Sequence, residues 1–182
     1  MRIIRGLYKA RRFSPPKTFP SRPTTDYAKE GLFNVLENRI DFVDLSILDL
    51  CAGTGNISME FLSREAGMVT SVDKHPVCIR YMYKLKQELN IGDEWQIAKN
   101  DVLQFAEKTP STYDLIFSDP PYDMTFHQQL VESILERKLL NPNGWMIIEH
   151  GRQTDLSSVP HFLDVRQFGN VYFSFFKLES NT

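Results

Sequence analysis

The sequence contains few cysteines and no long apolar run, and each absence excludes a class of protein. Its 182 residues include 2 cysteines, Cys51 and Cys78, which form no CxxC pair and have no histidine at a zinc-like spacing. We therefore expect neither a structural disulfide nor a bound metal. No stretch approaches the roughly 18 consecutive apolar residues of a membrane span. The basic N-terminus also lacks the apolar stretch of a signal peptide, so we expect a cytoplasmic protein.

The bulk composition is that of one globular domain. Hydrophobic residues make up 42% of the chain and charged residues 24%, as in an ordinary soluble protein. A chain of 182 residues is long enough to bury one core and short for two. We find no internal repeat and no low-complexity segment.

The formal net charge of −2 conceals a polarised chain. Residues 1–30 hold eight basic side chains against Asp26 and Glu30, a local charge of +6, so the remainder carries −8. A basic end of this kind indicates contact with a polyanion. The alternative is a solvated basic tail, but such a tail would not need the interleaved Ile3, Leu7 and Phe13. We therefore predict an ordered basic hairpin or arm.

Strand-like and helix-like segments alternate along the rest of the chain. A proline-rich linker ends near Pro23, and Thr24, Thr25 and Asp26 then cap a helix. Short apolar runs predict five strands, each followed by a helical pattern or a turn, and two further strands flank a tight turn at Phe168-Gly169-Asn170. The predicted strands cover residues 47–50, 68–73, 95–98, 113–118, 145–149, 162–167 and 171–178.

Apolar spacing predicts which helix positions face inward. In the first helix they are Ala28, Leu32, Val35, Leu36 and Ile40, and a second helix reaches about Ala66. Pro76 opens a helix, and a later one precedes the turn Asn141-Pro142-Asn143-Gly144. Their predicted inward residues are Val77, Tyr81, Leu85 and Leu89, and then Phe126, Leu130, Ile134 and Leu135.

This alternation predicts an α/β fold: a mostly parallel seven-stranded sheet with helices on both faces and a C-terminal antiparallel hairpin. In open sheets of this kind, ligands bind beyond the carboxyl ends of the strands. The residues that end the first four strands are therefore the candidate site.

The first strand runs into a glycine turn. Gly53 and Gly55 allow a sharp turn and a close approach to a ligand. The segment resembles a dinucleotide fingerprint, but Ser58 occupies the third glycine position, so that pattern is incomplete. Asp49 suits the ammonium group of an amino-acid ligand; a capping role for the turn is the alternative.

The second and third strands also end in carboxylates. Asp73 can accept two hydrogen bonds from a ribose diol, as adenosine cofactors require. Asp101 can accept from an adenine amino group while Val102 packs on the ring. Either aspartate could instead cap a helix.

The fourth strand ends in the most specific motif of the sequence, Asp119-Pro120-Pro121-Tyr122. Two prolines remove two N–H donors, which leaves carbonyls and the Asp119 carboxylate as acceptors beside an aromatic ring. Such a pocket fits an aryl amine whose base stacks on Tyr122. Hydrogen bonds to the amine localise its lone pair and aim it at a sulfonium methyl. The alternative is a proline-rich turn without chemistry.

At these residues the chain resembles the RsmD family of small-subunit ribosomal RNA guanine-N2 methyltransferases. Three stretches carry the resemblance: Arg2-Ile3-Ile4 with Arg22-Pro23-Thr24-Thr25-Asp26, Leu48 to Gly55, and Asp119 to Tyr122. The resemblance implies a Rossmann-like class I methyltransferase that uses S-adenosylmethionine. Its target would be the N2 amine of one guanine in 16S rRNA, in an assembled small subunit, with the base turned out into the pocket.

The resemblance and the strand ends together assign roles. Residues 1–23 are predicted to be an RNA-facing extension, and residues 24–182 are predicted to form the methyltransferase domain. We expect the protein to be a monomer. The predicted catalytic residues are Asp119, Pro120, Pro121 and Tyr122. The predicted cofactor-binding residues are Asp49, Cys51, Ala52, Gly53, Thr54, Gly55, Asn56, Asp73, Lys74, Asp101 and Val102. The predicted RNA-binding residues are Arg2, Arg5, Lys9, Arg11, Arg12, Lys17 and Arg22.

The chain departs from the family pattern at four positions. Arg5 replaces the usual glycine, Cys51 replaces phenylalanine, and Tyr27 and Lys29 stand where the family favours arginine. We place Arg5, Tyr27 and Lys29 in the RNA-facing region. Cys51 is interpreted as a small buried residue and His127 as a surface residue, and the aromatic run Tyr172 to Phe176 is interpreted as core.

Other functions remain open. A DNA adenine-N6 or cytosine-N4 methyltransferase uses the same motif but usually needs a target-recognition domain. A protein-glutamine methyltransferase would have Asn in place of Asp119. An NAD-dependent oxidoreductase would have glycine at position 58, and a non-catalytic RNA-binding module would bind without turnover.

Overall fold

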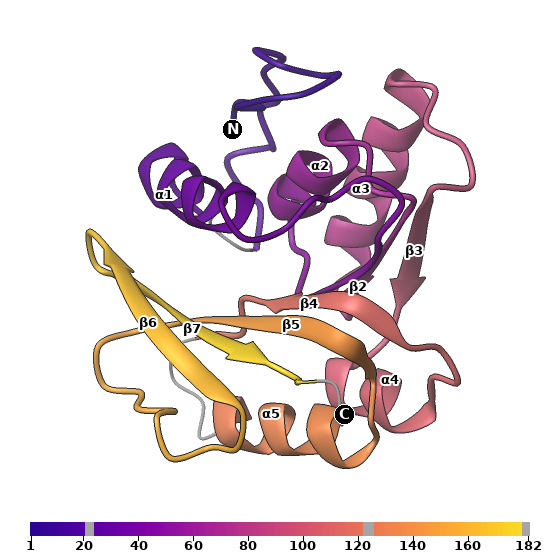
Figure 1. Cartoon of the computed structure of the whole chain (residues 1–182). Helices are drawn as coiled ribbons and strands as arrows, with labels where there is room; N and C mark the ends of the chain where they lie inside the picture. Colours follow the sequence, from indigo (N-terminus) through magenta and orange to yellow (C-terminus); the bar gives the residue numbers. More distant parts are fainter. Residues whose placement is uncertain (21–23, 122–125, 180–182) are drawn as a thin grey trace.

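A computed structural model describes residues 1–20, 24–121 and 126–179. Five helices and seven strands alternate along this part of the chain (Figure 1). The helices are α1 (Asp26–Glu37), α2 (Asn56–Ser63), α3 (Pro76–Glu88), α4 (Val102–Lys108) and α5 (Phe126–Glu136). The strands are β1 (Ser46–Leu50), β2 (Met68–Asp73), β3 (Trp95–Lys99), β4 (Tyr113–Ser118), β5 (Leu140–His150), β6 (Phe162–Phe168) and β7 (Val171–Lys177).

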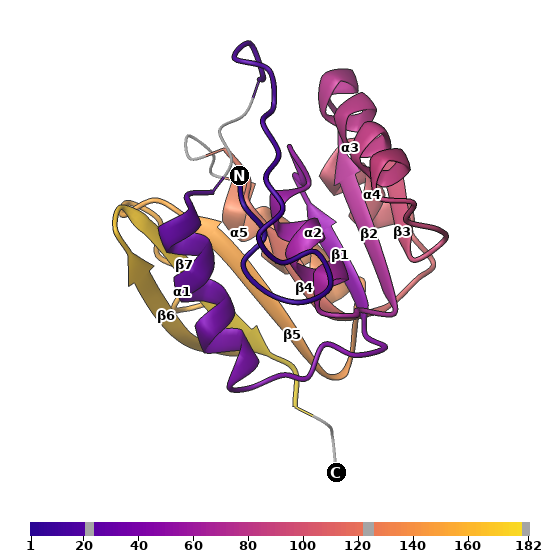
Figure 2. The same ribbon diagram turned by 90° about the horizontal axis from the view of Figure 1, so that it is seen from above.

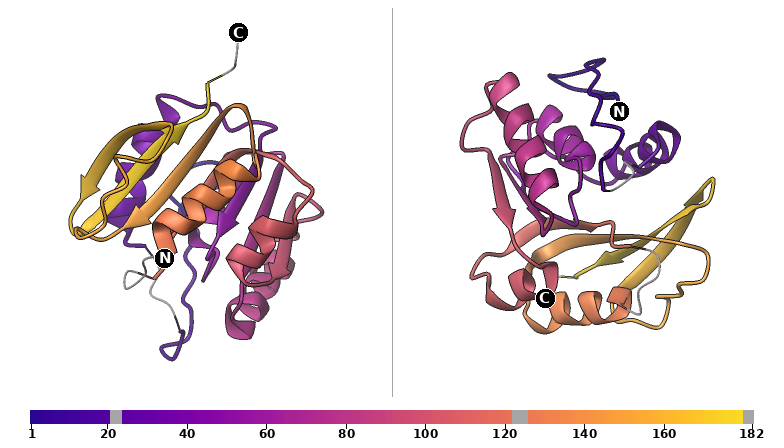
Figure 3. Two further views of the ribbon diagram at one scale, coloured as in Figure 1. Left: turned by 90° about the horizontal axis from the view of Figure 1, so that it is seen from below. Right: turned by 180° about the vertical axis from the view of Figure 1, so that it is seen from behind.

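The strands form one sheet in the order β3-β2-β1-β4-β5-β7-β6. The first five are parallel, and β7 is antiparallel to both β5 and β6. Helices α1, α2 and α3 cover one face and α4 and α5 the other, as the views from below and behind show (Figure 3). The predicted α/β sheet with a closing antiparallel hairpin is therefore confirmed.

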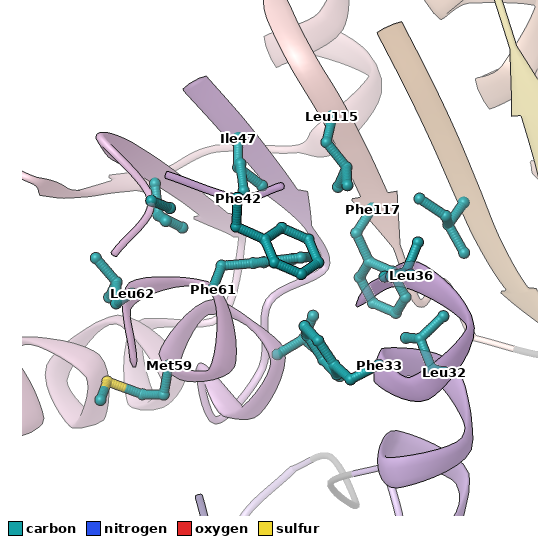
Figure 4. Close-up of a cluster of buried hydrophobic side chains, with 14 of the residues drawn as sticks. Leu32, Phe33, Leu36, Phe42, Ile47, Met59, Phe61, Leu62, Leu115 and Phe117 are labelled. Atoms are coloured by element: carbon teal, nitrogen blue, oxygen red, sulfur yellow. The ribbon is translucent and has the colours of Figure 1, made fainter. Parts of the chain in front are cut away.

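Two hydrophobic cores hold the layers together. On the α1–α3 face, the rings of Phe33, Phe42 and Phe61 pack with centroids 5.1 to 6.0 Å apart, next to Phe117 of β4 (Figure 4). The second core lies between the sheet and α4 and α5. Phe173 and Phe175 join the first core and Phe176 the second, as predicted. Tyr172 instead is only partly buried and stacks on His150.

Local sequence explains where two of the helices begin. Thr25 is the N-cap of α1, and its side chain accepts a hydrogen bond from the amide of Ala28 at 3.2 Å. At α3, Pro76 occupies the first turn, where its missing N–H costs nothing, and His75 is the N-cap.

The N-terminal residues form the predicted basic hairpin. Arg2 pairs with Arg12 across an antiparallel bridge, and the amide of Ile3 donates to the carbonyl of Arg11 at 3.0 Å. The side chain of Ile3 is fully buried in the first core. The amide of Leu7 donates to the carbonyl of Ser63 at 2.8 Å, so the hairpin is anchored on α2.

Several local predictions were wrong. Strand β5 begins at Leu140, because the predicted turn at 141–144 is absorbed into the strand as a bulge opposite Tyr113 and Leu115. Helix α4 was not predicted as an element, and α2 ends at Ser63, before Ala66.

Two inward faces also differ from the prediction. Helix α3 buries Cys78, Met82 and Leu85, while Tyr81 lies at the edge against Phe19, with ring centroids 5.4 Å apart. His127, predicted on the surface, is 1% exposed because α5 turns that side chain toward the sheet.

Within the described residues, no helix is long and apolar enough to cross a membrane.

Candidate functional site

A pocket of about 240 Å³ opens at the carboxyl edge of the central strands. It brings together the ends of β1, β2 and β4 and the residues after β3, which lie far apart in sequence. Ten of the predicted cofactor-binding residues and two of the predicted catalytic residues line it. They are Asp49, Cys51, Ala52, Gly53, Thr54, Asn56, Asp73, Lys74, Asp101, Val102, Asp119 and Pro121.

Two predicted residues within the described part of the chain, Pro120 and Gly55, do not line the pocket. Pro120 is buried, and Tyr122 lies outside the described residues. A Cβ on Gly55 would lie 3.1 Å from both Met82 Cγ and the Trp95 ring, and φ there is +72°, so packing against α3 and β3 requires the glycine.

The loop after β1 turns sharply toward the pocket. Cys51, Gly53 and Gly55 all have positive φ, at 61°, 55° and 72°. Burial and the nearby carboxylates of Asp73, Asp119 and Asp49 raise the pKa of the Cys51 thiol well above its usual range. The thiol therefore stays protonated, which makes Cys51 a packing residue rather than a redox centre.

Backbone amides hold Asp73 in place at the end of β2. Its Oδ2 accepts from the amide of Gly53 at 2.9 Å and its Oδ1 accepts from the amide of His75 at 2.8 Å. An ionised carboxylate offers about four acceptor positions, so two remain for a diol.

Asp101 has the capping role that was the alternative, and its place in the pocket leaves the cofactor role open to it. It caps α4 through Oδ1, which accepts from the amides of Leu103 and Gln104 at 3.0 and 3.3 Å. It also lines the pocket beside Val102. Capping occupies one carboxylate oxygen, so the other is available to a ligand donor.

Asp49 ends a buried chain of hydrogen bonds. Trp95 Nε1 donates to Ser71 Oγ at 2.8 Å, Ser71 Oγ lies 2.6 Å from Ser58 Oγ, and the Ser58 hydroxyl donates to Asp49. The indole nitrogen of Trp95 can only donate, and the hydroxyl of Ser58 donates to Asp49. The three hydrogen bonds therefore all run in one direction, toward Asp49. Ser58, which breaks the dinucleotide fingerprint, thus links α2 to β1 and β2.

Burial raises the pKa of Asp49 to about 7, although the hydrogen bond from Ser58 acts to lower this pKa. Asp119 directly follows β4, the strand paired with β1, and burial together with the charges of Glu149 and Asp49 raises the pKa of Asp119 well above its usual range. A cation bound between them would relieve this repulsion, so the site is electrostatically prepared for a positively charged ligand.

The raised pKa of Asp49 predicts how stability depends on pH. Between about pH 4 and 7, Asp49 is protonated in the folded state and ionised in the unfolded state, so the free energy of unfolding falls as pH rises. At 1.36 kcal/mol per unit, the loss by pH 8 is about 4 kcal/mol, of which about 1 to 2 kcal/mol is already lost at pH 5. Asp49→Asn removes this titration, so its stability relative to the wild type should rise by about 2 to 3 kcal/mol between pH 5 and pH 8.

Urea unfolding of both proteins at pH 5 and pH 8 measures this difference. The exposed Asp93 provides the control, because Asp93→Asn should leave the pH difference unchanged. Equal pH differences in the wild type and Asp49→Asn would contradict the assignment.

Some of the residues that line the pocket were not predicted from the sequence. Pro20 and Thr24 reach the pocket from the segment before α1, and Phe117 contributes from β4. Thr24 was noted only as a possible helix cap. Its hydroxyl instead donates to Glu149 Oε2 at 3.1 Å, a contact between residues 125 positions apart.

The predicted RNA-binding cations lie on the outside of the hairpin and the segment that follows it. Arg2, Arg5, Lys9, Arg11, Arg12 and Lys17 are exposed, and Arg22 lies outside the described residues. Arg5 Nη1 lies 2.5 Å from Glu37 Oε2, so part of its charge is neutralised. Viewed from above, the segment after the hairpin reaches beyond the ends of the central strands (Figure 2).

Lys29 does not face solvent, contrary to the prediction. Its side chain is fully buried, and Nζ lies 2.8 Å from Glu60 Oε1. Nζ also donates to the carbonyl of Arg2 at 2.6 Å and to Asn56 Oδ1 at 2.8 Å. The ammonium therefore joins the hairpin, α1 and α2 instead of contacting RNA. Tyr27, in contrast, is 68% exposed.

No group of three or more metal-binding side chains occurs in the part of the chain that the structure describes. The acidic residues of the pocket contact backbone amides, as Asp73 and Asp101 do, or a hydroxyl, as Asp49 does.

Comparison with solved structures defines the fold class. A hypothetical protein of Thermus thermophilus, TTHA0928, superposes with a TM-score of 0.81 at 22% identity, covering 98% of this chain and 99% of that one. An RNA methyltransferase from Salinibacter ruber, in complex with S-adenosyl-L-homocysteine, superposes with a TM-score of 0.66 at 13% identity, covering 88% and 96%. The fold is that of a Rossmann-like class I methyltransferase.

Sequence comparison then gives the family. The family model described as "Conserved hypothetical protein 95" matches residues 1–177. Ribosomal RNA small subunit methyltransferase D of Escherichia coli (strain K12) is 32% identical over 149 residues, covering 82% of this chain and 71% of that protein. The chain belongs to the family that this model describes, and the resemblance to the RsmD family is confirmed.

Proposed function

We propose that this protein transfers a methyl group from S-adenosylmethionine to the N2 amine of a guanine in 16S rRNA. One observation carries the proposal: Asp119, the acceptor for an aryl amine, shares a pocket with the carboxylates suited to an adenosine cofactor. Membership in the family supports the same substrate class, because the Escherichia coli relative is named as a small-subunit rRNA methyltransferase.

The pocket residues fit each part of S-adenosylmethionine. Asp73 and Asp101 offer acceptors to the ribose diol and the adenine amine, with Val102 against the ring. Asp49, fully buried and charged only with difficulty, suits the ammonium of the methionine end. The bound cofactor supplies an electrophilic methyl on a sulfonium. The ammonium of its methionine end favours the ionised form of Asp49.

Asp119 and its neighbours then orient the amine. The carboxylate accepts from the N2 hydrogens, and the Pro120 carbonyl provides a second acceptor, because proline has no N–H to compete. These hydrogen bonds direct the nitrogen lone pair toward the methyl group, and positioning supplies most of the rate. As the N–C bond forms, the S–C bond of the sulfonium would break to leave a neutral thioether, and Asp119 would accept the proton that the amine loses. Stacking on Tyr122 completes the proposal, although Tyr122 lies outside the described residues.

The hairpin supplies the RNA contact in this proposal. Its exposed cations, with those of the following segment, form the RNA-facing surface of residues 1–23, next to the domain of residues 24–182. We propose an assembled small subunit as substrate, and a monomeric enzyme that needs no metal and acts in the cytoplasm.

Labelled methyl transfer tests the function directly. Purified protein and labelled cofactor are incubated with methylation-deficient small ribosomal subunits, free rRNA and DNA, and the product is mapped by mass spectrometry. We expect one N2-methylguanine in 16S rRNA. Transfer to DNA adenine or cytosine would support the DNA-methyltransferase alternative, and binding without transfer would support a non-catalytic module.

Removing the hairpin cations should weaken RNA binding. We expect the triple variant Arg2→Ala, Arg11→Ala and Arg12→Ala to lower the slope of log K against log salt by about 2, because each phosphate contact contributes about 0.7. Filter binding across a salt series measures the slope. The matched control changes Lys108, Arg137 and Lys138, three exposed cations beyond the opposite edge of the sheet. An unchanged slope in the hairpin variant would place the RNA elsewhere.

A further inference from the structure

Thr24 forms part of the pocket wall and is held from two sides. Its carbonyl accepts from Asn56 Nδ2 at 3.1 Å, and Asn56 Oδ1 in turn accepts from the buried Lys29 Nζ at 2.8 Å. Its hydroxyl donates to Glu149 Oε2 at 3.1 Å. The residue is 9% exposed and lines the pocket together with Asp119. Thr24 is therefore a fixed polar group of the site.

Glu149 brings Thr24 close to Asp119. Ser118, the last residue of β4, is in register with Ile148 of β5, so Asp119 lies just past the end of β4, beside the strand that carries Glu149. Ile147 points into the α1–α3 core, and side chains alternate along a strand, so Glu149 faces the same side of the sheet. The charge of Glu149 also raises the pKa of Asp119, and Asp119 lines the pocket with Thr24. Thr24 lies over Glu149, on the β5 side of Asp119.

The contact with Glu149 determines whether the Thr24 hydroxyl donates or accepts a hydrogen bond toward the pocket. A hydroxyl has one hydrogen and two lone pairs. Because the single hydrogen of the hydroxyl is donated to Glu149 Oε2, the hydroxyl can only accept toward the pocket. The wall beside Asp119 therefore offers a second acceptor next to the first.

Two adjacent acceptors discriminate between the amino bases. In guanine, the ring nitrogen beside the amine, N1, carries a hydrogen and donates. In adenine and cytosine, the ring nitrogen beside the amine is an acceptor and would face the Thr24 lone pairs without a hydrogen between them. A buried acceptor facing an acceptor costs binding energy, so the pair favours guanine.

We propose that Thr24, with its hydroxyl hydrogen held by Glu149, reads guanine N1–H and so selects guanine over adenine and cytosine. The inference rests on the proposed guanine-N2 methylation and adds to it two specificity-determining residues outside the Asp119 motif. Thr24 contacts the base directly, and Glu149 acts through Thr24 as a positioning residue.

The test replaces the target guanine by 2-aminopurine, which keeps the 2-amino group but has a ring acceptor in place of N1–H. Small subunits are reconstituted from 16S rRNA that carries either base at the mapped position. The quantity measured is the ratio of kcat/KM for guanine to that for 2-aminopurine. The analogue also lacks O6, but that loss affects all variants alike, so the change in the ratio isolates N1.

We expect the wild-type enzyme to prefer guanine by about 10- to 100-fold. Thr24→Ser keeps the hydroxyl and should keep this ratio, whereas Thr24→Val should reduce it to about threefold or less. Glu149→Gln should also reduce it, because the glutamine amide can donate to Thr24 and release the hydroxyl hydrogen toward the pocket. A ratio requires only residual activity, so reduced stability of a variant does not obscure the result.

Two outcomes would overturn the inference separately from the function. If the wild type methylates guanine and Thr24→Val keeps the full ratio, Thr24 does not read N1. If Thr24→Val changes only the affinity for S-adenosylmethionine in calorimetry, the residue serves the cofactor. If the wild type transfers no methyl group to guanine, the proposed function fails and this inference fails with it.

Discussion

Replacing Asp119 by alanine is expected to lower kcat for methyl transfer by about 10³-fold or more, with the affinity for S-adenosylmethionine changed by less than about threefold. The carboxylate is the acceptor that orients the amine, and lost orientation and electrostatic stabilisation are costly at this scale. The fold should survive, because Asp119 is a partly buried carboxyl whose pKa is raised by desolvation and by the charge of Glu149. Removing it relieves that unfavourable environment.

Asp119→Asn is the matched variant. Its side-chain oxygen still accepts from the amine, so we expect activity between the wild type and alanine. Single-turnover transfer measures the chemical step, and calorimetry measures the cofactor affinity. Full activity in Asp119→Ala would refute the role of the carboxylate. A parallel loss of cofactor affinity in both variants would reassign Asp119 to cofactor binding.

Glu60→Gln is expected to destabilise the folded protein by about 3 to 5 kcal/mol, because it removes the charge from the centre of a buried ion cluster. Glu60 is fully buried, and its oxygens lie 2.8 Å from Lys29 Nζ and 2.5 Å from Arg64 Nη1. It also accepts from the amide of Ile4 at 2.9 Å. Glutamine keeps the shape but leaves the buried Lys29 without its close counter-charge, whereas Arg64 keeps Glu37 at 2.7 Å.

Urea unfolding at pH 7 measures the loss, and Glu88→Gln is the control. Glu88 pairs with Lys84 at 3.6 Å, and both side chains are about half exposed or more, so the expected change is below about 0.5 kcal/mol. Equal small effects in the two variants would show that the cluster around Glu60 contributes no more than a surface pair.

The ion cluster also connects the hairpin to the pocket. Lys29 holds the backbone of Arg2 on one side and Asn56 on the other, and Asn56 lines the pocket. The basic hairpin is therefore fixed relative to the site rather than tethered loosely. In the proposed reaction, this arrangement lets phosphate contacts on the hairpin set the position of the target base.

The sequence by itself determined the alternation of strands and helices and the place of the site. Strands read as apolar runs because they are buried on both faces, and parallel strands must end at a common edge. Asp49, Asp73, Asp101 and Asp119 are therefore predictable as neighbours from their positions in the chain, since each lies within two residues of the end of a strand.

Only the tertiary structure decided which polar residues are buried and what they contact. Lys29, Glu60 and His127 look like surface residues in a sequence pattern, yet all three are buried, and Lys29 and Glu60 pair across 31 positions. Thr24 meets Glu149 across 125 positions. Periodicity reports the solvent exposure of an average side chain, whereas a buried polar group depends on a specific partner, and only the folded chain brings that partner within reach.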